Sequence, residues 1–255
     1  MLTAITRAVS PALANCVLSF VPRIPIDLEK ACAQHREYEQ LLRQLGARVI
    51  SLPPEPTLPD SMFVEDPALV LDELAVIFPL GTESRRPEAV SIAQALEPYR
   101  RLKFIALPAT IEGGDILRID RSILVGVTRR TNAEGIRELT RILAPYRYNV
   151  IPVAVTGCLH LKSAVTYLGR STLLANRAWF DPAPFRSFRV IDVDPSESHA
   201  ANVLAFAGTV IVPASFPRTR AIIESAGFVV TPLDISELQK AESGLTCSSL
   251  LFDTH

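Results

Sequence analysis

Acidic, histidine and cysteine side chains recur at points that are far apart in the chain but share a local context. Glu112 and His160 each precede a predicted hairpin and are 48 residues apart, and the pair Glu65-Asp66 lies about the same interval upstream. Cys247 opens the last predicted strand of this kind. If these positions converge in space, a thiol, an imidazole and several carboxylates surround one ligand. Such a set can attack a cationic carbon and move protons around it.

A repeating unit of a hairpin, a helix and a further strand spans nearly all of the chain and would position these residues. Two-residue turns join the predicted hairpin strands, which are 68–71 with 74–78, 115–119 with 122–127, 163–168 with 171–175, and 203–206 with 209–213. Apolar periodicity predicts helices at 27–45, 88–96, 133–143 and 219–226. Strands are expected after the last three of these helices, at 102–107, 149–155 and 228–233.

Two units depart from this repeat. Between residues 181 and 194, proline-rich sequence stands where a helix would be. The last unit lacks a second strand, and we expect the amino-terminal residues 2–9 to supply it, which would close a ring without a free sheet edge. We therefore predict an α/β fold, a five-unit α/β propeller of ββαβ repeats with pseudo-fivefold symmetry, formed by residues 1–255 as a single domain.

Composition restricts the partners and the compartment. The 26 basic and 27 acidic residues nearly cancel, which argues against nucleic acid and anionic membranes as partners, while 48% hydrophobic residues suffice for a large core. The four cysteines lack C-x-x-C spacing, and no signal peptide or long apolar segment is recognisable. We expect a cytoplasmic protein with reduced thiols and a small-molecule partner, and the sequence leaves a homodimer open.

Five segments, in this order, resemble the motifs of the dimethylarginine dimethylaminohydrolases. They are DSMFVEDP at 60–67, EGGD at 112–115, RTNAEG at 130–135, LHLK at 159–162 and GLTC at 244–247. The resemblance covers essentially the whole chain. The EGGD motif and the late cysteine are typical of the wider guanidino-modifying superfamily, whereas the first segment is more particular to the dimethylarginine branch.

The resemblance implies a pentein propeller that hydrolyses free Nω-methylated arginine to citrulline and methylamine or dimethylamine, without a cofactor or a metal. Cys247 would be the nucleophile and would carry a covalent thiouronium intermediate. His160 would protonate the departing amine and then deprotonate the attacking water, while Glu112 would orient the imidazole. Glu65 and Asp66 would bind the guanidinium nitrogens, and Phe63 of the same motif would also contact the substrate.

The resemblance also implies a set of contacts for the amino-acid end of the substrate. Arg85 and Arg130 would bind the α-carboxylate. Asp60 and the backbone carbonyl of Leu18 would bind the α-amino group, and segment 15–25 would act as a lid. A free amino acid is therefore the expected substrate, since a methylarginine inside a protein chain has no α-carboxylate.

Three alternatives remain beside this interpretation. The protein could hydrolyse another small guanidino or ureido compound, or it could bind an arginine-like ligand as a non-catalytic sensor. The sensor hypothesis does not require the set of Cys247, His160 and Glu112. A zinc site built from the same three residues is disfavoured, because no local pair has the spacing of metal ligands.

Overall fold

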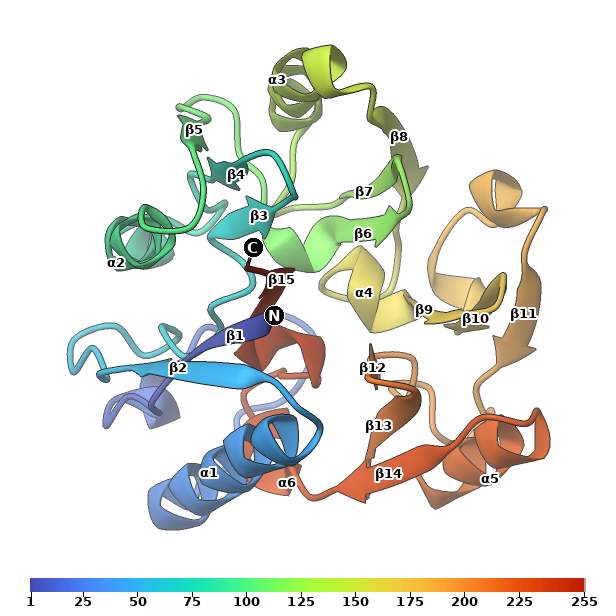
Figure 1. The fold of residues 1–255 in the computed structure, drawn as a ribbon. Coiled ribbons are helices and arrows are strands. Elements are labelled where there is room, and N and C mark those ends of the chain that lie inside the picture. Colours follow the sequence, from blue (N-terminus) through green and yellow to red (C-terminus); the bar gives the residue numbers. More distant parts are fainter. Residues whose placement is uncertain (255) are drawn as a thin grey trace.

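The computed structural model describes residues 1–254, which form five three-stranded sheets arranged around a common centre (Figure 1). Each sheet has the same connectivity, in which an inner strand pairs antiparallel with the middle strand and the middle strand pairs parallel with the outer one. This repetition confirms the predicted five-unit α/β propeller. The inner strands place their amino-terminal ends near the centre.

The strands follow the chain in order from inner to outer in four of the sheets. The first is β3 (Ala68–Val70), β4 (Ala75–Ile77) and β5 (Leu102–Phe104), and the second is β6 (Ile116–Ile119), β7 (Ser122–Val127) and β8 (Asn149–Ala154). The third is β9 (Val165–Gly169), β10 (Thr172–Ala175) and β11 (Arg189–Asp192), and the fourth is β12 (Leu204–Phe206), β13 (Thr209–Pro213) and β14 (Val230–Leu233). The Ala207-Gly208 turn has positive φ at both residues, as a two-residue hairpin requires.

The fifth sheet joins the two ends of the chain. Strand β15 (Leu250–Asp253) is the inner strand, β1 (Leu2–Arg7) is the middle strand and β2 (Arg48–Leu52) is the outer strand. Leu2 pairs with Asp253, and the amino group of Met1 lies 2.7 Å from the carbonyl oxygen of Thr254. Both ends of the chain therefore lie close to the centre (Figure 1), and the amino-terminal strand closes the ring as predicted.

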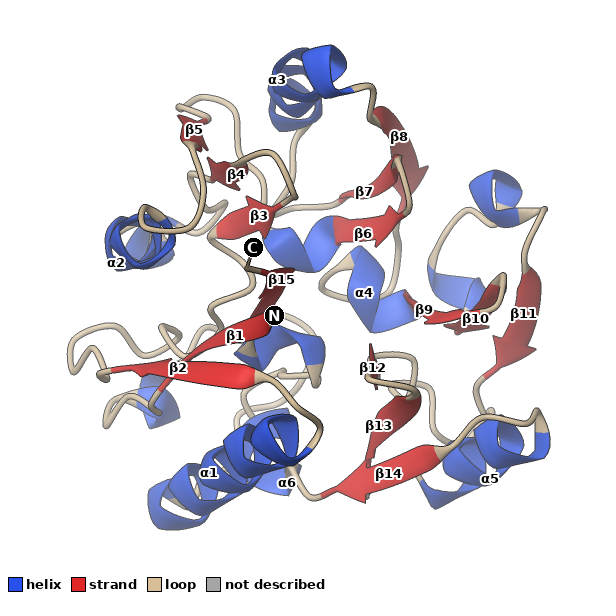
Figure 2. Ribbon diagram, in the orientation of Figure 1, coloured by secondary structure: helices blue, strands red, loops and turns tan. Residues whose placement is uncertain are grey.

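The longer helices lie on the rim of the propeller, outside the sheets (Figure 2). They are α1 (Leu28–Gln44), α2 (Glu88–Leu96), α3 (Ala133–Leu143) and α5 (Pro217–Ser225). Helix α1 begins where the Asp27 carboxylate accepts a hydrogen bond from the Lys30 backbone N–H, and it ends before Gly46, which adopts a φ of 93°. In the third unit, 3-10 turns at Arg177–Trp179 and Ala183–Phe185 occupy the place of the helix, as the proline-rich sequence indicated.

Two short helices were not predicted, one near the centre of the ring and one beside helix α1 (Figure 1). They are α4 (Leu161–Ala164) and α6 (Ser236–Gln239). The strand expected at 163–168 begins only at Val165, because α4 intervenes and the Asp115 carboxylate accepts a hydrogen bond from the Leu161 N–H at 3.0 Å. Apolar residues of neighbouring sheets pack together; for example, Leu117 and Leu124 of one sheet share a cluster with Leu173 of the next. Within residues 1–254, no helix is long and apolar enough to cross a membrane.

Candidate active site

Most of the sequence-predicted residues line one narrow cavity of about 20 Å³, and several of them come from the openings of the inner strands. The thiol of Cys247 comes from a 3-10 turn before β15, and the ring of His160 comes from the residue that precedes α4. Glu65 and Asp66 come from the segment before β3. The predicted residues that line the cavity are Cys247, His160, Asp60, Phe63, Glu65, Asp66, Arg85 and Arg130.

Glu112 lies behind His160 and is completely buried. One oxygen of its carboxylate is 2.7 Å from Nε2 of His160, and the other accepts hydrogen bonds from the Gly81 N–H and from Arg130. Burial opposes the charge of both partners, but His160 and the nearby arginines hold the pKa of Glu112 at about 2. Burial alone would lower the pKa of His160, but the surrounding carboxylates raise this pKa to about 9. The pair is therefore an imidazolium and a carboxylate at neutral pH.

Two glycines allow the histidine and the acidic residues to approach one another. A side chain at Gly114 would place its Cβ 2.4 Å from Nδ1 of His160, and one at Gly113 would lie 2.0 Å from the Glu65 carbonyl oxygen. Neither position accommodates a larger residue without displacing the site. Close packing therefore explains the two glycines of the EGGD motif. Asp115, the last residue of the motif, accepts a hydrogen bond from the Leu161 N–H through one oxygen and from a threonine hydroxyl through the other.

Cys247 is partly exposed through the cavity, and its thiol is neutral in the absence of a ligand. Burial, together with the carboxylates of Glu65 and Asp66, raises the pKa of this thiol to about 12. The backbone N–H of Gly244 lies 3.4 Å from Sγ. A cation placed among the same carboxylates would offset their charge and favour the thiolate.

The two acids predicted to bind a guanidinium are engaged by other residues in this structure. Glu65 forms an ion pair with Lys162 and accepts a hydrogen bond from the Thr246 hydroxyl at 2.8 Å. Asp66 accepts hydrogen bonds from Arg85 at 2.9 Å and from the Gly114 N–H at 3.1 Å. A planar cation would exchange part of these contacts for its own N–H groups.

The two arginines predicted to bind a carboxylate both line the cavity. Arg85 is buried and pairs with Glu88 and Asp66, while Arg130 donates to Glu112 and, at 3.3 Å, to the Ser19 hydroxyl. Both therefore have partners before any ligand binds. Each guanidinium carries five N–H donors and makes fewer than five hydrogen bonds here, so both arginines keep donors for a ligand.

Asp60 is buried beside these arginines, and its two oxygens accept hydrogen bonds from the Val17 backbone N–H, each at 3.2 Å. Burial raises the pKa of Asp60, although Arg85 opposes the shift. Val17 of this segment lines the cavity, and the predicted Leu18 is the next residue along the chain. The expected lid therefore contacts the site through Asp60.

Segment 15–25 is held over the site by a residue close to Cys247. The carboxylate of Glu242 accepts hydrogen bonds from the backbone N–H groups of Ser19 and Phe20, at 2.7 and 2.5 Å. Glu242 adopts a φ of 61°, in the left-handed region that residues with side chains rarely occupy. A strained residue thus joins the segment to the turn that carries the thiol.

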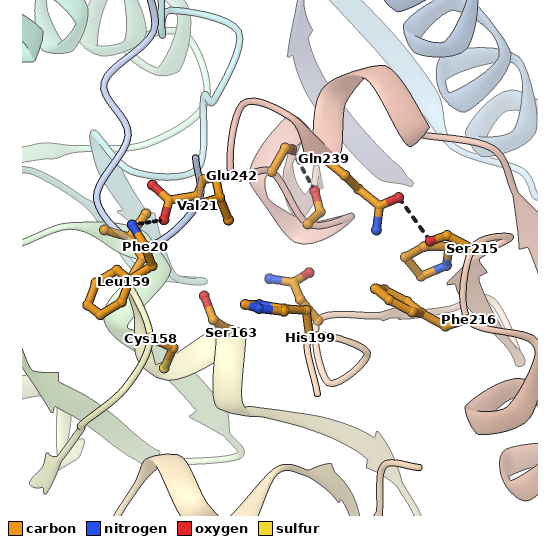
Figure 3. A pocket seen from close by; sticks show the side chains of 14 residues that line it. Phe20, Val21, Cys158, Leu159, Ser163, His199, Ser215, Phe216, Gln239 and Glu242 are labelled. Carbon is orange, nitrogen blue, oxygen red and sulfur yellow. Dashed lines mark hydrogen bonds between the residues drawn. The ribbon is translucent and has the colours of Figure 1, made fainter. Parts of the chain in front are cut away.

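A second, larger cavity of about 340 Å³ adjoins the narrow one, and the two share walls at Ser163, Asn202 and Glu242. Figure 3 shows the hydrogen bond from the Phe20 N–H to the Glu242 carboxylate on one side of this cavity, and Phe216 on the other. The ring of His199, which also lines it, packs against Trp179 in a tilted arrangement, with ring centres 4.9 Å apart. This cavity provides an approach to the narrow site.

A metal ion has a candidate ligand set here that differs from the one considered in the sequence. Ligand atoms of Asp66, Glu112 and His160 lie within 4.8 Å of one another, without Cys247. All three already have protein partners, since Glu112 bonds to His160 and Asp66 bonds to Arg85. A metal would have to displace these contacts, so the arrangement fits proton transfer better.

Three residues that shape the site had no predicted role. Lys162 neutralises Glu65, and Thr246 bonds to the same acid. Asn202 accepts a hydrogen bond from the Thr246 N–H at 3.1 Å and so fixes the turn before Cys247. Lys162 lies in the LHLK segment two residues after His160, which could have indicated it, whereas Asn202 belongs to a different sheet and gave no local signal.

Comparisons with known proteins place the chain among relatives of one family. The family model described as N,N dimethylarginine dimethylhydrolase, eukaryotic, matches residues 23–175. The N(G),N(G)-dimethylarginine dimethylaminohydrolase of Pseudomonas aeruginosa is 36% identical over 228 residues, which are 89% of this chain and 90% of that protein. The Streptomyces coelicolor protein of the same name is 34% identical over 249 residues, 97% of this chain and 95% of its own.

Solved structures of similar proteins share the fold. A cysteine-to-serine variant of the Pseudomonas aeruginosa protein complexed with citrulline superposes with a TM-score of 0.93 at 34% identity and covers 98% of each chain. A dimethylarginine dimethylaminohydrolase adduct with S-methyl-L-thiocitrulline gives a TM-score of 0.94 at 34% identity and covers 99% of this chain and 100% of that one.

Proposed function

The chain belongs to the dimethylarginine dimethylaminohydrolase family, and we propose that it hydrolyses free Nω-methylated arginine to citrulline and methylamine or dimethylamine. One observation carries the proposal. A single cavity is lined by the thiol of Cys247, the ring of His160 and the carboxylates of Glu65 and Asp66. Those groups suit a planar cation that is to be attacked at carbon. A solved structure of a family member contains citrulline, which is the product expected here.

In the first half of the proposed reaction, the thiolate of Cys247 attacks the guanidinium carbon and forms a C–S bond. His160, which is protonated at neutral pH because its pKa lies near 9, gives its proton to the methylated nitrogen. The C–N bond then breaks and the amine leaves. The product of this half is a thiouronium adduct on Cys247 and a neutral imidazole.

In the second half, the neutral imidazole of His160 takes a proton from a water molecule that attacks the adduct carbon. The C–S bond breaks, and citrulline and the thiol of Cys247 are released. Glu112, which bonds to His160 at 2.7 Å, stabilises the imidazolium at the start and end of the cycle. The thiol proton that Cys247 loses to solvent when the guanidinium binds is replaced by one proton of the water as the C–S bond breaks, and the other proton of the water restores the one that His160 gave to the amine.

The substrate activates its own nucleophile in this proposal. The free thiol has a pKa of about 12 because burial and the carboxylates of Glu65 and Asp66 oppose a second negative charge. A bound guanidinium brings a positive charge to the same place. This charge lowers the pKa of the Cys247 thiol, so the thiolate forms only when a substrate is bound.

The amino-acid end of the substrate would bind at the opposite end of the cavity. Arg85 and Arg130 offer unused N–H donors to the α-carboxylate, and Asp60 offers an acceptor to the α-amino group together with the backbone carbonyl of Leu18. Segment 15–25 would open to admit the substrate, since a cavity of about 20 Å³ has room for about one water molecule.

We extend the proposal to the rest of the molecule. Residues 1–255 would act as one catalytic domain, without a cofactor and with a small molecule rather than a nucleic acid or a membrane as partner. The four cysteines are free thiols in the structure. This state supports a reducing compartment such as the cytoplasm.

Replacement of Cys247 by serine tests the function. With arginine, monomethylarginine and asymmetric dimethylarginine as substrates, the wild-type protein should release citrulline from the methylated forms. Cys247→Ser should reduce this by at least about 10³-fold, while the matched control Cys32→Ser on helix α1 should retain it. Turnover only of another guanidino or ureido compound would favour the first alternative, and binding without turnover would favour the sensor.

A further inference from the structure

We propose that Glu88 is a positioning residue that holds Arg85 in the orientation required to bind the α-carboxylate of the substrate. The inference rests on the function proposed above, in which Arg85 binds that group. Glu88 is the first residue of helix α2 and lies outside the five family motifs. It therefore acts on the reaction through Arg85.

The contact between the two residues is a two-point fork. Nε of Arg85 donates to one carboxylate oxygen of Glu88 at 3.0 Å, and Nη2 donates to the other at 2.9 Å. Two parallel bonds fix the plane of a guanidinium, whereas one bond leaves it free to turn. The guanidinium carbon also lies over the ring of Phe63, 5.9 Å from the centre of that ring. The fork and the aromatic ring together restrict the position of the guanidinium.

Burial makes this constraint stronger than that of a surface ion pair. Arg85 is 4% exposed and Glu88 is 2% exposed, so water does not compete for the fork. The start of a helix also favours a negative charge. Burial, with the charges of Asp60 and Asp66, nevertheless raises the pKa of Glu88 to about 7, against the opposing effect of Arg85. Keeping the Glu88 carboxylate charged at this buried position costs desolvation free energy, which an apolar residue that served only packing would not cost.

The count of donors shows what the fork achieves. A guanidinium has five N–H groups. Glu88 takes two of them and Asp66 takes one at 2.9 Å, which leaves two for a ligand in the cavity that Arg85 lines. Without Glu88, Asp66 would be the carboxylate bonded to Arg85. It would draw the guanidinium toward itself and away from the substrate's carboxylate.

The test compares ligands with and without an α-carboxylate. For Glu88→Gln, the KM for monomethylarginine should rise by about tenfold or more, and kcat should stay within about threefold. The inhibition constant of decarboxylated monomethylarginine, which lacks the group that Arg85 binds, should not change. Glu83→Gln is the matched control, since Glu83 lies on the neighbouring turn with a side chain that is 90% exposed. It should leave both constants unaltered.

A structural role for Glu88 would give a different pattern. An equal loss of affinity for the two ligands, or an unchanged KM, would overturn the proposal. If Glu88→Gln does not fold, Glu88→Asp carries the test, because it keeps the charge but shortens the side chain by one carbon. It should raise the KM for monomethylarginine without affecting the decarboxylated ligand, and the same two contrary results would overturn the proposal.

Arg85→Ala separates this inference from the proposed function. If Arg85→Ala raises the KM for monomethylarginine while the Glu88 variants do not, the positioning role fails and the assigned carboxylate site stands. If Arg85→Ala leaves that KM unchanged, the carboxylate site itself is misassigned, and the role of Glu88 fails with it. Absence of turnover in the wild-type protein would refute both.

Discussion

At the scale of single residues, charge decides what the site can do. The thiol of Cys247 and the imidazole of His160 line the same cavity. Burial together with nearby carboxylates raises the pKa of the thiol to about 12, and carboxylates raise the pKa of the imidazole to about 9 against the effect of burial. The thiol is therefore uncharged and the imidazole is charged at neutral pH. A reactive thiolate and imidazolium pair, as found in many cysteine enzymes, would require a compensating positive charge. The cationic substrate supplies it.

This charge arrangement predicts how Cys247 reacts with small alkylating agents. With the neutral reagent 2-chloroacetamide, the rate of modification should rise about tenfold for each pH unit and show no plateau up to pH 10, because the thiolate fraction keeps rising toward a pKa of about 12. The cationic 2-chloroacetamidine, which has the same leaving group, should react much faster at pH 7.5. Mass spectrometry of the peptide that contains Cys247 follows both reactions.

A plateau between pH 7 and 9 with the neutral reagent would contradict this account of the thiol. So would equal rates for the two reagents at pH 7.5. The peptides that contain Cys16 and Cys32 serve as internal controls. Neither should prefer the cationic reagent, because these two thiols lie outside the walls of the catalytic cavity.

The residues that sequence alone identified are those with a chemical signature. Cys247, His160 and Glu112 belong to recognisable motifs, and each lies at the opening of a different sheet. Asn202 and Glu88 were missed because their roles depend on partners elsewhere in the fold. Asn202 acts across 44 residues of sequence, and Glu88 reads as an ordinary first residue of a helix.

At the scale of elements, short turns predicted the hairpins well, because inner and middle strands are adjacent in sequence. Helices α2 and α3 have the predicted bounds. The single turn of α4 could not be predicted, since it depends on the Asp115 carboxylate of the neighbouring unit. One-turn helices are set by such tertiary contacts rather than by their own periodicity.

The lid segment 15–25 should depend on Glu242. In Glu242→Ala, the backbone N–H groups of Ser19 and Phe20 lose their acceptor, so their hydrogen exchange should accelerate by about tenfold. The KM for methylarginine should rise at the same time, because the closed state over the cavity is weakened. Hydrogen exchange with mass spectrometry, followed by steady-state kinetics, measures both effects.

Glu224→Ala is a suitable control, since this residue lies on the outer helix α5 and forms a surface ion pair with Arg220. It should change neither exchange in segment 15–25 nor the KM. Unaltered exchange at Ser19 and Phe20 in Glu242→Ala would show that the bonds from Glu242 do not hold the segment.

At the scale of the whole molecule, the ring is closed by pairing of the two chain ends. The antiparallel pair of β1 and β15 includes the bond between the Met1 amino group and Thr254. This closure could be predicted because the last unit lacked one strand. The convergence of strand openings on one centre followed from it, whereas the size of the cavity depends on side-chain packing that the sequence pattern does not specify.

A circular permutant tests the closure. Joining the natural ends through a short glycine linker and opening the chain at the exposed Ala207-Gly208 turn should give a folded, active protein. Its melting temperature should lie within about 10 °C of the wild-type value, since only one hairpin turn is lost. Insertion of the new ends inside the central strand β7 should prevent folding. Equal behaviour of the two permutants would contradict the closed-ring architecture.

The central claim is that Cys247 forms a covalent bond with the guanidinium carbon of the substrate. Rapid acid quenching of the enzyme during turnover of asymmetric dimethylarginine, followed by tryptic digestion, isolates the peptide after Lys240, whose sole cysteine is Cys247. The account predicts that this peptide gains the mass of the substrate minus that of dimethylamine. Continued release of citrulline with this peptide unmodified at every quench time would contradict it.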